Sequence, residues 1–365
     1  MKIFYVNFVQ SGCSKWRAEI PTKYLLRRGH VVNSADDGSQ PECPDVIIFS
    51  RQYGSDVFRL YNWAKDRGIR VVYDTDDALD LIDPWNPAYA FSRRHRAEAE
   101  FMAAHAHVVT TTTPELADNL RKLNPNVVVI PNSVDPEEWT LQPRRPEQPV
   151  CIGWLGGSSH FLDLAIAADA LSELAKKKTF RFVIYGLTPM SSVDLLYRKS
   201  LETHGERFRN SHLGKAIKVF LRKTEQLPYS FQPFVRASQY AETLCNLGFD
   251  IGIAPLADTA FNRNKSCIKY YEYGMSGAVT VASNVLPYSA EVPILCDNTR
   301  NSWKERIAEL IQLDLKQIWR TQHEWIMTNR NIERNVVMWE EVLGGSATPA
   351  DSQQIQSGSR DLAAV

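Results

Sequence analysis

Residues 258–283 constrain the fold of this chain more than any other stretch. They follow an apolar run at 250–256, which has the length and β-branched content of a short buried strand and is ended by Pro255. Residues 265–273 have helical spacing, and residues 278–283 form a second apolar run. The stretch therefore predicts strand, loop, helix and strand, the repeating unit of a parallel α/β sheet.

The polar residues of this stretch indicate a ligand at the start of the predicted helix. Glu272 is a carboxylate on the helix face that buries apolar residues, where it is costly unless it serves a ligand. A helix N-terminus offers unpaired N–H groups and a partial positive charge. Asn262, Lys265 and Ser266 at that end therefore suit a diphosphate, to which Lys265 adds a full charge.

The alternative is that Lys265 and Lys269 only solvate an exposed helix, which is the commoner role of a single lysine. The clustering of Asn, Lys, Ser and Glu with glycines at one strand end favours a site. We expect Gly274 and Gly277 to end the helix, with Gly274 in a left-handed cap.

Residues 255–277 can be written PL-x-D-x-x-FN-x-x-KS-x-x-K-x-x-EYG-x-x-G. This pattern resembles the donor-site motif of retaining GT-B glycosyltransferases, in the family-four, or group-one, superfamily. The resemblance implies an α/β chain with two Rossmann-like domains facing across a cleft and a C-terminal helix that crosses back to the first domain. The family motif carries two glutamates; Glu272 matches the second, and Asn264 stands where the first is found.

The resemblance also implies an activity, the transfer of a sugar from a nucleotide-diphosphate sugar to an acceptor hydroxyl with retention. Glu272 would hold the ribose hydroxyls, and the Lys265–Ser266 turn would face the phosphates and the sugar. Asn262, Asn264 and Lys269 would complete this donor side. The nucleotide sugar is the co-substrate, and no firm metal requirement follows.

The N-terminus predicts a strand at residues 2–9, a loop, and a helix at 21–28. A glycine-containing loop at the carboxyl end of a strand is a usual ligand position in open α/β sheets, although a plain tight turn has the same pattern. The resemblance places this loop near the acceptor or the sugar. Gly12, Ser14 and Arg17 are the candidates there.

Three aspartates, Asp74, Asp76 and Asp77, follow a predicted strand at residues 70–73. Their mutual repulsion costs energy unless positive charge arrives. A helix cap with a solvated loop would explain them equally, but their position at a strand end favours function. Asp76 and Asp77 could contact sugar hydroxyls or orient the acceptor; a metal is possible there but not required.

The proline-rich run at 142–149 predicts a linker between a first domain at 1–143 and a second at 150–343. In the second domain, Gly156, Gly157 and Ser158 follow a predicted strand, and glycines let a backbone approach phosphate closely. His160 either touches donor or acceptor or simply caps the next helix. Residues 344–365 lack periodicity and predict a disordered tail.

Residues 198–223 are strongly basic. Eight lysines and arginines face two glutamates there: Arg198, Lys199, Arg207, Arg209, Lys215, Lys218, Arg222 and Lys223, against Glu202 and Glu206. A solubilising helical insertion is the ordinary explanation of such a run. The functional explanation is an arm that binds an anionic acceptor, such as DNA or a lipid head group.

Composition limits the class of protein. Forty-two basic and 42 acidic residues give a formal net charge of zero, so nucleic acid or an anionic membrane could be bound only through a local patch. Six cysteines occur singly, which argues against zinc and against a disulfide scaffold and favours reducing cytosol. The N-terminus lacks the pattern of a signal peptide and no run suits a membrane span, so a cytoplasmic protein is expected.

Two other functions stay open. A nucleotide-sugar epimerase on the same fold would turn over the donor without an acceptor, and the basic segment argues against it. A non-catalytic protein that binds a sugar nucleotide or nucleic acid would explain Asn264 in place of a glutamate. The presence of Glu272 and Lys265 argues against that second alternative.

Overall fold

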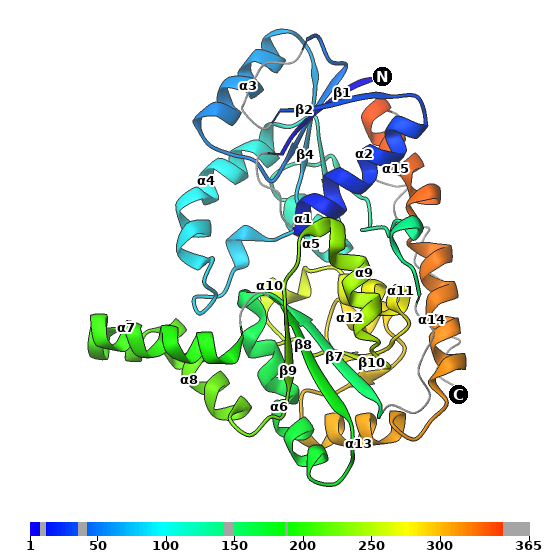
Figure 1. The fold of residues 1–365 in the computed structure, drawn as a ribbon. Helices are drawn as coiled ribbons and strands as arrows, with labels where there is room; N and C mark the ends of the chain where they lie inside the picture. The colour runs from blue at the N-terminus through cyan, green and yellow to red at the C-terminus, as the bar shows by residue number, and fades with distance from the viewer. Residues whose placement is uncertain (8–11, 36–41, 142–148, 187–188, 346–365) are drawn as a thin grey trace.

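The computed structural model describes residues 1–7, 12–35, 42–141, 149–186 and 189–345. Most of the predicted linker, residues 142–148, and the predicted tail from residue 346 onward lie outside these ranges. The chain forms two α/β domains, one above the other in Figure 1, with the C-terminal helices running along one side of both.

The first domain is a parallel sheet of six strands in the order β2-β1-β3-β4-β5-β6. The strands are β1 (Lys2–Val6), β2 (Val31–Ala35), β3 (Val46–Ser50), β4 (Arg70–Asp74), β5 (Val108–Thr111) and β6 (Val127–Val129). The helices are α1 (Gly12–Ser14), the π-helix η1 (Lys15–Glu19), α2 (Ile20–Arg27), α3 (Ser55–Asp66), η2 (Leu79–Leu81), α4 (Tyr89–His105), α5 (Pro114–Leu120) and η3 (Pro136–Glu138).

The second domain is another parallel six-stranded sheet, in the order β12-β11-β10-β7-β8-β9. Its strands are β7 (Cys151–Gly156), β8 (Arg181–Gly186), β9 (Ser230–Pro233), β10 (Ile251–Ala254), β11 (Val279–Ser283) and β12 (Leu295–Cys296). Its helices are η4 (Ser158–His160), α6 (Phe161–Ala175), α7 (Met190–Asn210), α8 (His212–Thr224), α9 (Ala237–Leu247), α10 (Ala260–Arg263), α11 (Ile268–Ser276), α12 (Tyr288–Glu291), α13 (Arg300–Leu310), α14 (Leu315–Asn329) and α15 (Ile332–Gly344).

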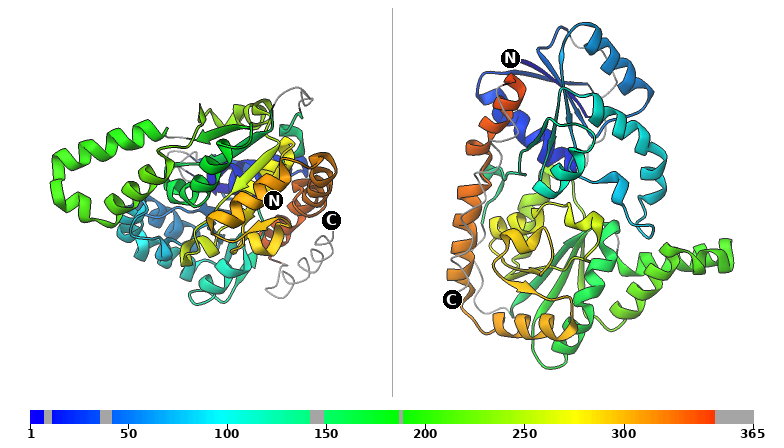
Figure 2. Two further views of the ribbon diagram at one scale, coloured as in Figure 1. Left: turned by 90° about the horizontal axis from the view of Figure 1, so that it is seen from below. Right: turned by 180° about the vertical axis from the view of Figure 1, so that it is seen from behind.

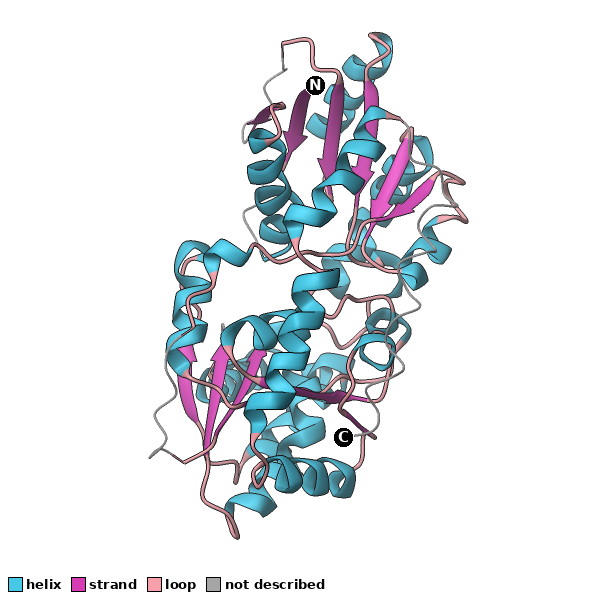
Figure 3. Cartoon of the chain, turned by 90° about the vertical axis from the view of Figure 1, so that its right-hand side faces the viewer, coloured by secondary structure: helices cyan, strands magenta, loops and turns pink. Residues whose placement is uncertain are grey.

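Helices cover both faces of each sheet, as Figure 3 shows. Central strands are therefore buried on both faces and are apolar along their length; all five residues of β3 are buried. The strand order changes direction between β1 and β3 in the first sheet, and between β7 and β10 in the second. Ligands of such sheets bind at the carboxyl ends of the strands that flank this change.

The key stretch differs in detail from its prediction. The helix expected at residues 265–273 is a short α10 followed by α11, which begins at Ile268. Gly277, with φ 98°, is the left-handed residue that ends α11, whereas Gly274 lies inside the helix. A Cβ atom on Gly274 would lie 2.3 Å from Ile326 Cδ1, so this glycine lets α14 approach closely. Strands β2, β9 and β12 were not predicted from the sequence.

The C-terminal helices cross back to the first domain, as the resemblance implies. Helix α14 lies along the second domain and α15 packs beside α2 (Figure 1), where Glu340 accepts from Arg28 and contacts His30, both at 2.7 Å. Residues 330–332, between α14 and α15, pair with Val134, which follows β6 on the segment leading out of the first sheet. Val134 N donates to Arg330 O at 2.6 Å, and Ile332 N donates to Val134 O at 3.0 Å. The described segment that leads out of the first sheet and the segment that returns from α14 to α15 thus lie side by side at Val134.

The basic segment belongs to a helical hairpin formed by α7 and α8, which projects from the second domain in both views of Figure 2. Helix α7 is interrupted at Gly205, whose φ of 53° and ψ of −136° are not helical. Helix α8 buries Ala216, Ile217 and Phe220 and exposes its basic residues. Within the described ranges, no helix combines the length and hydropathy that crossing a membrane needs.

Candidate functional site

Lys265 and Asp77 bring the two domains together at the candidate site. Asp77 follows β4 in the first domain, and Lys265 lies between α10 and α11 in the second. Lys265 Nζ is 3.4 Å from Asp77 Oδ1, and the two side chains are 21% and 17% exposed. Lys265 Nζ also lies 4.4 Å from the ring centroid of Phe261. Lys265, the cation expected to bind the diphosphate of the donor, therefore faces Asp77, one of the carboxylates expected to contact the sugar.

Arg51 compensates the charge of the aspartates, and sequence reasoning missed it. Its Nη1 lies 2.9 Å from Asp76 Oδ1 and 3.2 Å from Asp77 Oδ2, and it donates to Cys13 Sγ at 2.8 Å. Burial opposes ionisation of Asp76, but Arg51 and Cys13 outweigh it and hold the pKa of Asp76 below its usual range. Arg51 has φ 54°, a strained backbone for a residue other than glycine.

Cys13, Asp76 and Asp77 offer potential metal-ligand atoms within 4.8 Å of one another, the one such group in the described parts of the chain. The Arg51 guanidinium lies against all three of these side chains. Arg51 thus supplies the positive charge that the cluster of carboxylates requires. The arrangement fits a charge-balanced acidic network better than an open metal site.

Arg17 and Asp74 were expected on the acceptor or sugar side, but they form a buried ion pair. Arg17 Nη2 lies 2.6 Å from Asp74 Oδ1, and the two side chains are 1% and 0% exposed. Arg17 also donates to Ile130 O at 2.6 Å, and Asp74 accepts from Thr110 at 2.7 Å. Both groups are enclosed and bonded within the protein, so neither side chain is presented to an acceptor or a sugar in this structure.

Gly12 and Ser14 lie at the start of the first helical segment, next to residues 8–11, which are outside the described ranges. Gly12 is exposed, and a Cβ there would meet nothing within 4 Å. Ser14 is buried and donates to Asn7 Oδ1 at 3.1 Å. Gly12 therefore stays a candidate on geometric grounds, whereas Ser14 fastens its loop to the end of β1.

The glycine turn after β7 lies at the change of strand direction in the second sheet. Gly156 ends β7, Gly157 follows, and Ser158 begins η4. A Cβ on Gly156 would fall 2.2 Å from the Trp154 ring, so only glycine fits there. This position is where a sheet of this topology places a phosphate-bearing ligand.

His160 follows this turn and is held by Asp163. Its Nδ1 lies 2.7 Å from Asp163 Oδ2, and Asp163 Oδ1 accepts from Ala257 N, just after β10, at 2.8 Å. Burial, followed by the charges of Lys269 and Lys265, lowers the pKa of His160 to about 4, although Asp163 opposes this. The ring is therefore neutral at pH 7. Because the Asp163 carboxylate accepts the Nδ1 proton, Nε2 carries the lone pair.

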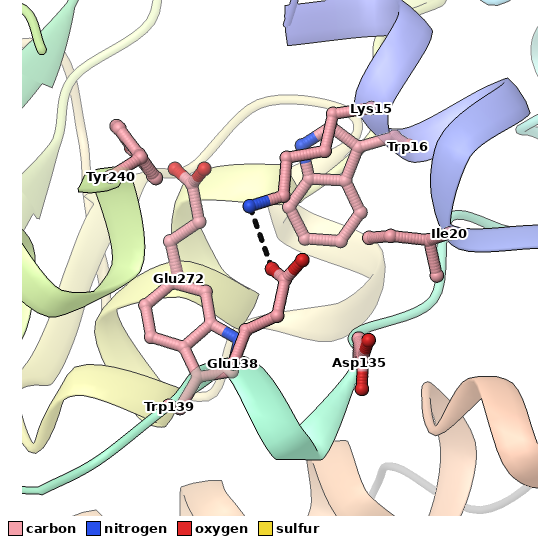
Figure 4. A pocket seen from close by; sticks show the side chains of 8 residues that line it. All are labelled: Lys15, Trp16, Ile20, Asp135, Glu138, Trp139, Tyr240 and Glu272. Carbon is pink, nitrogen blue, oxygen red and sulfur yellow. Dashed lines mark ion pairs between the residues drawn. The ribbon is translucent and has the colours of Figure 1, made fainter. Parts of the chain in front are cut away.

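Glu272 lies in a narrow pocket between the domains, seen in Figure 4. Burial raises the pKa of Glu272 to about 7, although a hydrogen bond from Tyr240 and the charges of Lys269 and Lys15 act to lower it. The pocket is lined by Lys15, Trp16, Ile20, Asp135, Glu138, Trp139, Tyr240 and Glu272. Lys15 Nζ lies 2.6 Å from Glu138 Oε2 (Figure 4), and the Tyr240 ring stacks on Tyr185 with centroids 5.3 Å apart.

Lys269 lies one helical turn before Glu272, and burial lowers its pKa. The charges that act on Lys269 are Asp163, Lys265 and Glu272. Two lysines, two carboxylates and His160 therefore influence one another around the end of β10. This mixed charge suits a ligand with both a diphosphate and hydroxyl groups.

The three smaller polar residues of the motif bond within the protein. Asn262 Nδ2 donates to Ala257 O at 2.9 Å, which shapes the loop after β10. Asn264 Nδ2 donates to Ala260 O at 2.7 Å, and its Oδ1 accepts from Asn119 of α5 at 2.8 Å. Ser266 Oγ accepts from Asn132 at 2.9 Å. Asn264 and Ser266 therefore join the two domains in this structure.

Comparisons with known proteins identify the fold. No family model matches the chain, and no curated protein matches it in sequence. A glycosyltransferase from Rickettsia africae ESF-5 superposes with TM-score 0.60 at 14% identity, covering 94% of this chain and 98% of the other. Anabaena Alr3699/HepE in complex with UDP superposes with TM-score 0.62 at 14% identity, covering 94% and 100%.

An α-glucosyltransferase in complex with UDP-glucose and DNA containing an abasic site gives TM-score 0.62 at 13% identity, covering 94% of this chain and 98% of the other. Such identities establish a shared fold. The chain therefore has the GT-B fold, with two Rossmann-like domains and the returning C-terminal helix, which confirms the predicted fold class.

Proposed function

We propose that this GT-B chain transfers a sugar from a nucleoside-diphosphate sugar to an acceptor hydroxyl, with retention at the anomeric carbon. The observation that carries the proposal is the placement of Lys265, Glu272 and the Gly156–Gly157 turn around the change of strand direction in the second sheet. These groups match the parts of one ligand. The glycine turn and Lys265 suit a diphosphate, and Glu272 suits vicinal ribose hydroxyls.

In this proposal Lys265 and the N-terminus of α11 stabilise the departing diphosphate. The negative charge on the leaving group grows as the bond to the sugar breaks, so a fixed cation beside it lowers the barrier. The neutral Nε2 of His160 accepts a hydrogen bond from a sugar hydroxyl. Uridine diphosphate sugars are the first donors to test, because two of the neighbours named above hold UDP or UDP-glucose.

Asp76 and Asp77 take the opposite side of the sugar. Arg51 fixes both carboxylates, and Asp77 faces Lys265 at 3.4 Å. Carboxylates beside a diphosphate would be repelled, whereas carboxylates beside hydroxyls accept hydrogen bonds. They therefore hold the transferred sugar or orient the acceptor hydroxyl.

We propose that the reaction takes place in the cytoplasm. The six cysteines support this compartment, because all of them lie in described residues and none forms a disulfide.

The acceptor is proposed to be anionic. Helices α7 and α8 carry eight lysines and arginines against Asp194, Glu202 and Glu206. A transferase needs a surface for an acceptor, whereas an epimerase does not. This basic hairpin therefore favours transfer over epimerisation.

Calorimetry with UDP, GDP, ADP and TDP, followed by incubation with the matching nucleotide sugars, tests the proposal. We expect one nucleoside diphosphate to bind and its glucose or N-acetylglucosamine conjugate to be consumed faster when acceptor is present. Retention is checked by NMR, from the anomeric coupling constants of donor and product. Rapid conversion of the donor to free sugar or to an epimer without acceptor would favour the epimerase, and binding without turnover would favour a non-catalytic protein.

A further inference from the structure

Helix α8 has a charged stripe that the packing of the second domain does not use. Lys215, Lys218 and Arg222 are exposed at spacings of three and four residues, which place them on one face of a helix. Within the described residues none of the three has an ion-pair partner, and α8 itself contains no acidic residue. The opposite face of α8 buries Ile217 and Phe220. The outer face thus carries three uncompensated charges.

Helix α7 adds further charge to the same hairpin. Lys199 and Arg207 are exposed and have no ion-pair partner in the described residues, whereas Arg198 pairs with Asp194 at 2.9 Å and Arg209 pairs with Glu206. The hairpin therefore projects a strong local positive charge from a chain whose overall charge is zero. Such a local excess is the footprint of a polyanionic partner.

A second feature, in the first domain, is an aromatic cluster of Tyr53, Phe91 and His95. The His95 ring lies 5.2 Å from the Tyr53 ring and 4.6 Å from the Phe91 ring, between centroids. Phe91 is 56% exposed, although a large apolar side chain gains most by burial. The cluster therefore presents an aromatic ring to solvent.

The aromatic cluster and the candidate site lie at the same edge of the first sheet. Tyr53 comes two residues after Arg51, which holds Asp76 and Asp77, and the charge of Arg51 acts on the Tyr53 hydroxyl. Phe91 and His95 are in the first half of α4, the half that follows the β4 loop. Arg93 and Arg94, also exposed, lie between them. An acceptor that reaches Asp77 from this side would meet aromatic and basic side chains together.

From these two features we propose that the acceptor is a nucleic-acid strand, with phosphates bound by the α7–α8 hairpin and a base stacked on Phe91. The inference rests on the proposed transferase function for the chemistry, but not for the binding. Proteins that bind single strands combine basic side chains, which neutralise the backbone, with aromatic rings on which bases stack. Either feature alone would be ordinary. Figure 1 shows α4 and the α7–α8 hairpin on the same side of the molecule, and this combination is what carries the inference.

A lipid bilayer is the other partner that basic and apolar side chains can serve, and Leu195 and Leu196 of α7 are exposed. The observations favour the strand for two reasons. The α8 stripe holds three charges and only one exposed apolar residue, Val219. The Phe91 ring packs against His95 at an interplanar angle of 50°, and His95 in turn stacks on Tyr53, so Phe91 is part of an aromatic cluster rather than a lone group for insertion.

The test is fluorescence anisotropy of a labelled 12-nucleotide single strand with the full-length protein, at four salt concentrations and without donor. The variant Lys215→Ala/Lys218→Ala/Arg222→Ala should weaken binding and reduce the slope of log affinity against log salt by about 2, since each phosphate contact contributes about 0.7. The matched control is Lys176→Ala/Lys177→Ala/Lys178→Ala, which removes the same charge from exposed positions before β8. The control should leave the slope unchanged.

The aromatic part has its own readout. Phe91→Ala should weaken binding about tenfold and leave the salt slope unchanged, because stacking involves no counterion release. Phe101→Ala, which changes a ring farther along α4, is the control and should bind like the parent protein. Equal slopes in parent and hairpin variant, or equal affinities in parent and Phe91→Ala, would overturn the proposal.

Vesicles of phosphatidylglycerol and phosphatidylcholine supply the competing outcome. If the protein floats with these vesicles, Leu195→Asn/Leu196→Asn abolishes flotation, and the strand does not bind, the partner is a membrane and the inference is wrong. Nucleoside-diphosphate affinity is measured in every variant. If it is retained while strand binding fails, the proposed function stands and only the acceptor assignment falls.

Discussion

Lys265 and Asp77 face one another from opposite domains, with Nζ 3.4 Å from Oδ1. The pair places the predicted cation for the leaving diphosphate beside a carboxylate that a diphosphate would repel. The diphosphate of an arriving donor must therefore compete with Asp77 for Lys265. Variants of the two residues should for this reason differ in transfer rate and in affinity for nucleoside diphosphate.

Lys265→Ala should lower the transfer rate by about 10²–10³-fold, because it removes a fixed charge aimed at the leaving group, worth about 2–4 kcal/mol in comparable sites. Its melting temperature should stay close to that of the parent, since Arg51 still compensates the charge of Asp77 when Lys265 is removed. Lys176→Ala, at an exposed position remote from the site, is the control. A full rate in Lys265→Ala with every donor that the parent uses would contradict the assignment.

Asp77→Asn should lower transfer without weakening nucleoside-diphosphate binding. The substitution removes the partner that holds Lys265 in the ligand-free protein, so the affinity measured by calorimetry should stay equal or rise. Asp76→Asn should also spare this affinity, because Asp76 pairs with Arg51 rather than Lys265. A drop in affinity for either variant would place the carboxylate on the diphosphate side instead.

Glu272→Gln should weaken nucleoside-diphosphate binding by about 1.5–3 kcal/mol, through loss of a charge-assisted hydrogen bond to ribose. The parent affinity should increase as pH rises through 7, because burial raises the pKa of Glu272 to about 7 and the ionised form is the better acceptor. Calorimetry at pH 6, 7 and 8 measures both effects. A pH dependence that persists in Glu272→Gln would assign it to another group.

The free energy of unfolding should decrease as Glu272 ionises, whereas the affinity for nucleoside diphosphate should increase. The folded pKa of Glu272 lies above the usual 4.5, so the folded state keeps its proton over a range in which the unfolded chain has lost it. The contribution of protonated Glu272 to the free energy of unfolding is fully present below about pH 4.5 and is lost as pH rises through 7. It amounts to on the order of 3 kcal/mol in total. Urea unfolding at pH 5 and 8 should therefore show a smaller decrease for Glu272→Gln than for the parent.

Arg17→Met should destabilise the protein by about 3–5 kcal/mol, because it leaves the Asp74 carboxylate buried without its partner. The double variant Arg17→Met/Asp74→Asn should recover part of that loss, since no uncompensated charge remains. Urea denaturation of both variants measures the difference. A single variant as stable as the parent, with transfer alone reduced, would restore Arg17 to the acceptor side.

The sequence predicted the motif at Lys265 and Glu272 because local order determines it: a strand, a turn and a helix end meet within one contiguous stretch. It could not separate Asp74 from Asp76 and Asp77. All three follow the same strand, and only the fold brings Arg17, 57 positions away, onto the first of them. The boundaries of α10 and α11 were also missed, because tertiary packing of Phe261 and Gly274 decides where each helix lies.

Arg51 had no usable sequence signal. A single arginine after a strand is ordinary, and its importance comes from a φ of 54° and from contacts with Cys13, Asp76 and Asp77 that the backbone geometry creates. Asn264 was seen as a departure from the family motif. Its actual partner, Asn119 of the first domain, depends on how the domains meet.

The hydrogen bonds between Val134 and residues 330–332 fasten the two interdomain crossings to each other. Two separate connections would fix an axis, and one alone would allow the domains to swivel freely. Here both connections pass through nearly the same point, and Arg330 anchors that point to Glu291 of the second domain at 2.6 Å. Motion between the domains therefore reduces to pivoting about Val134. Ser266 accepts from Asn132, two residues before Val134, so Lys265 beside it and its partner Asp77 lie near the pivot and separate little for a given rotation.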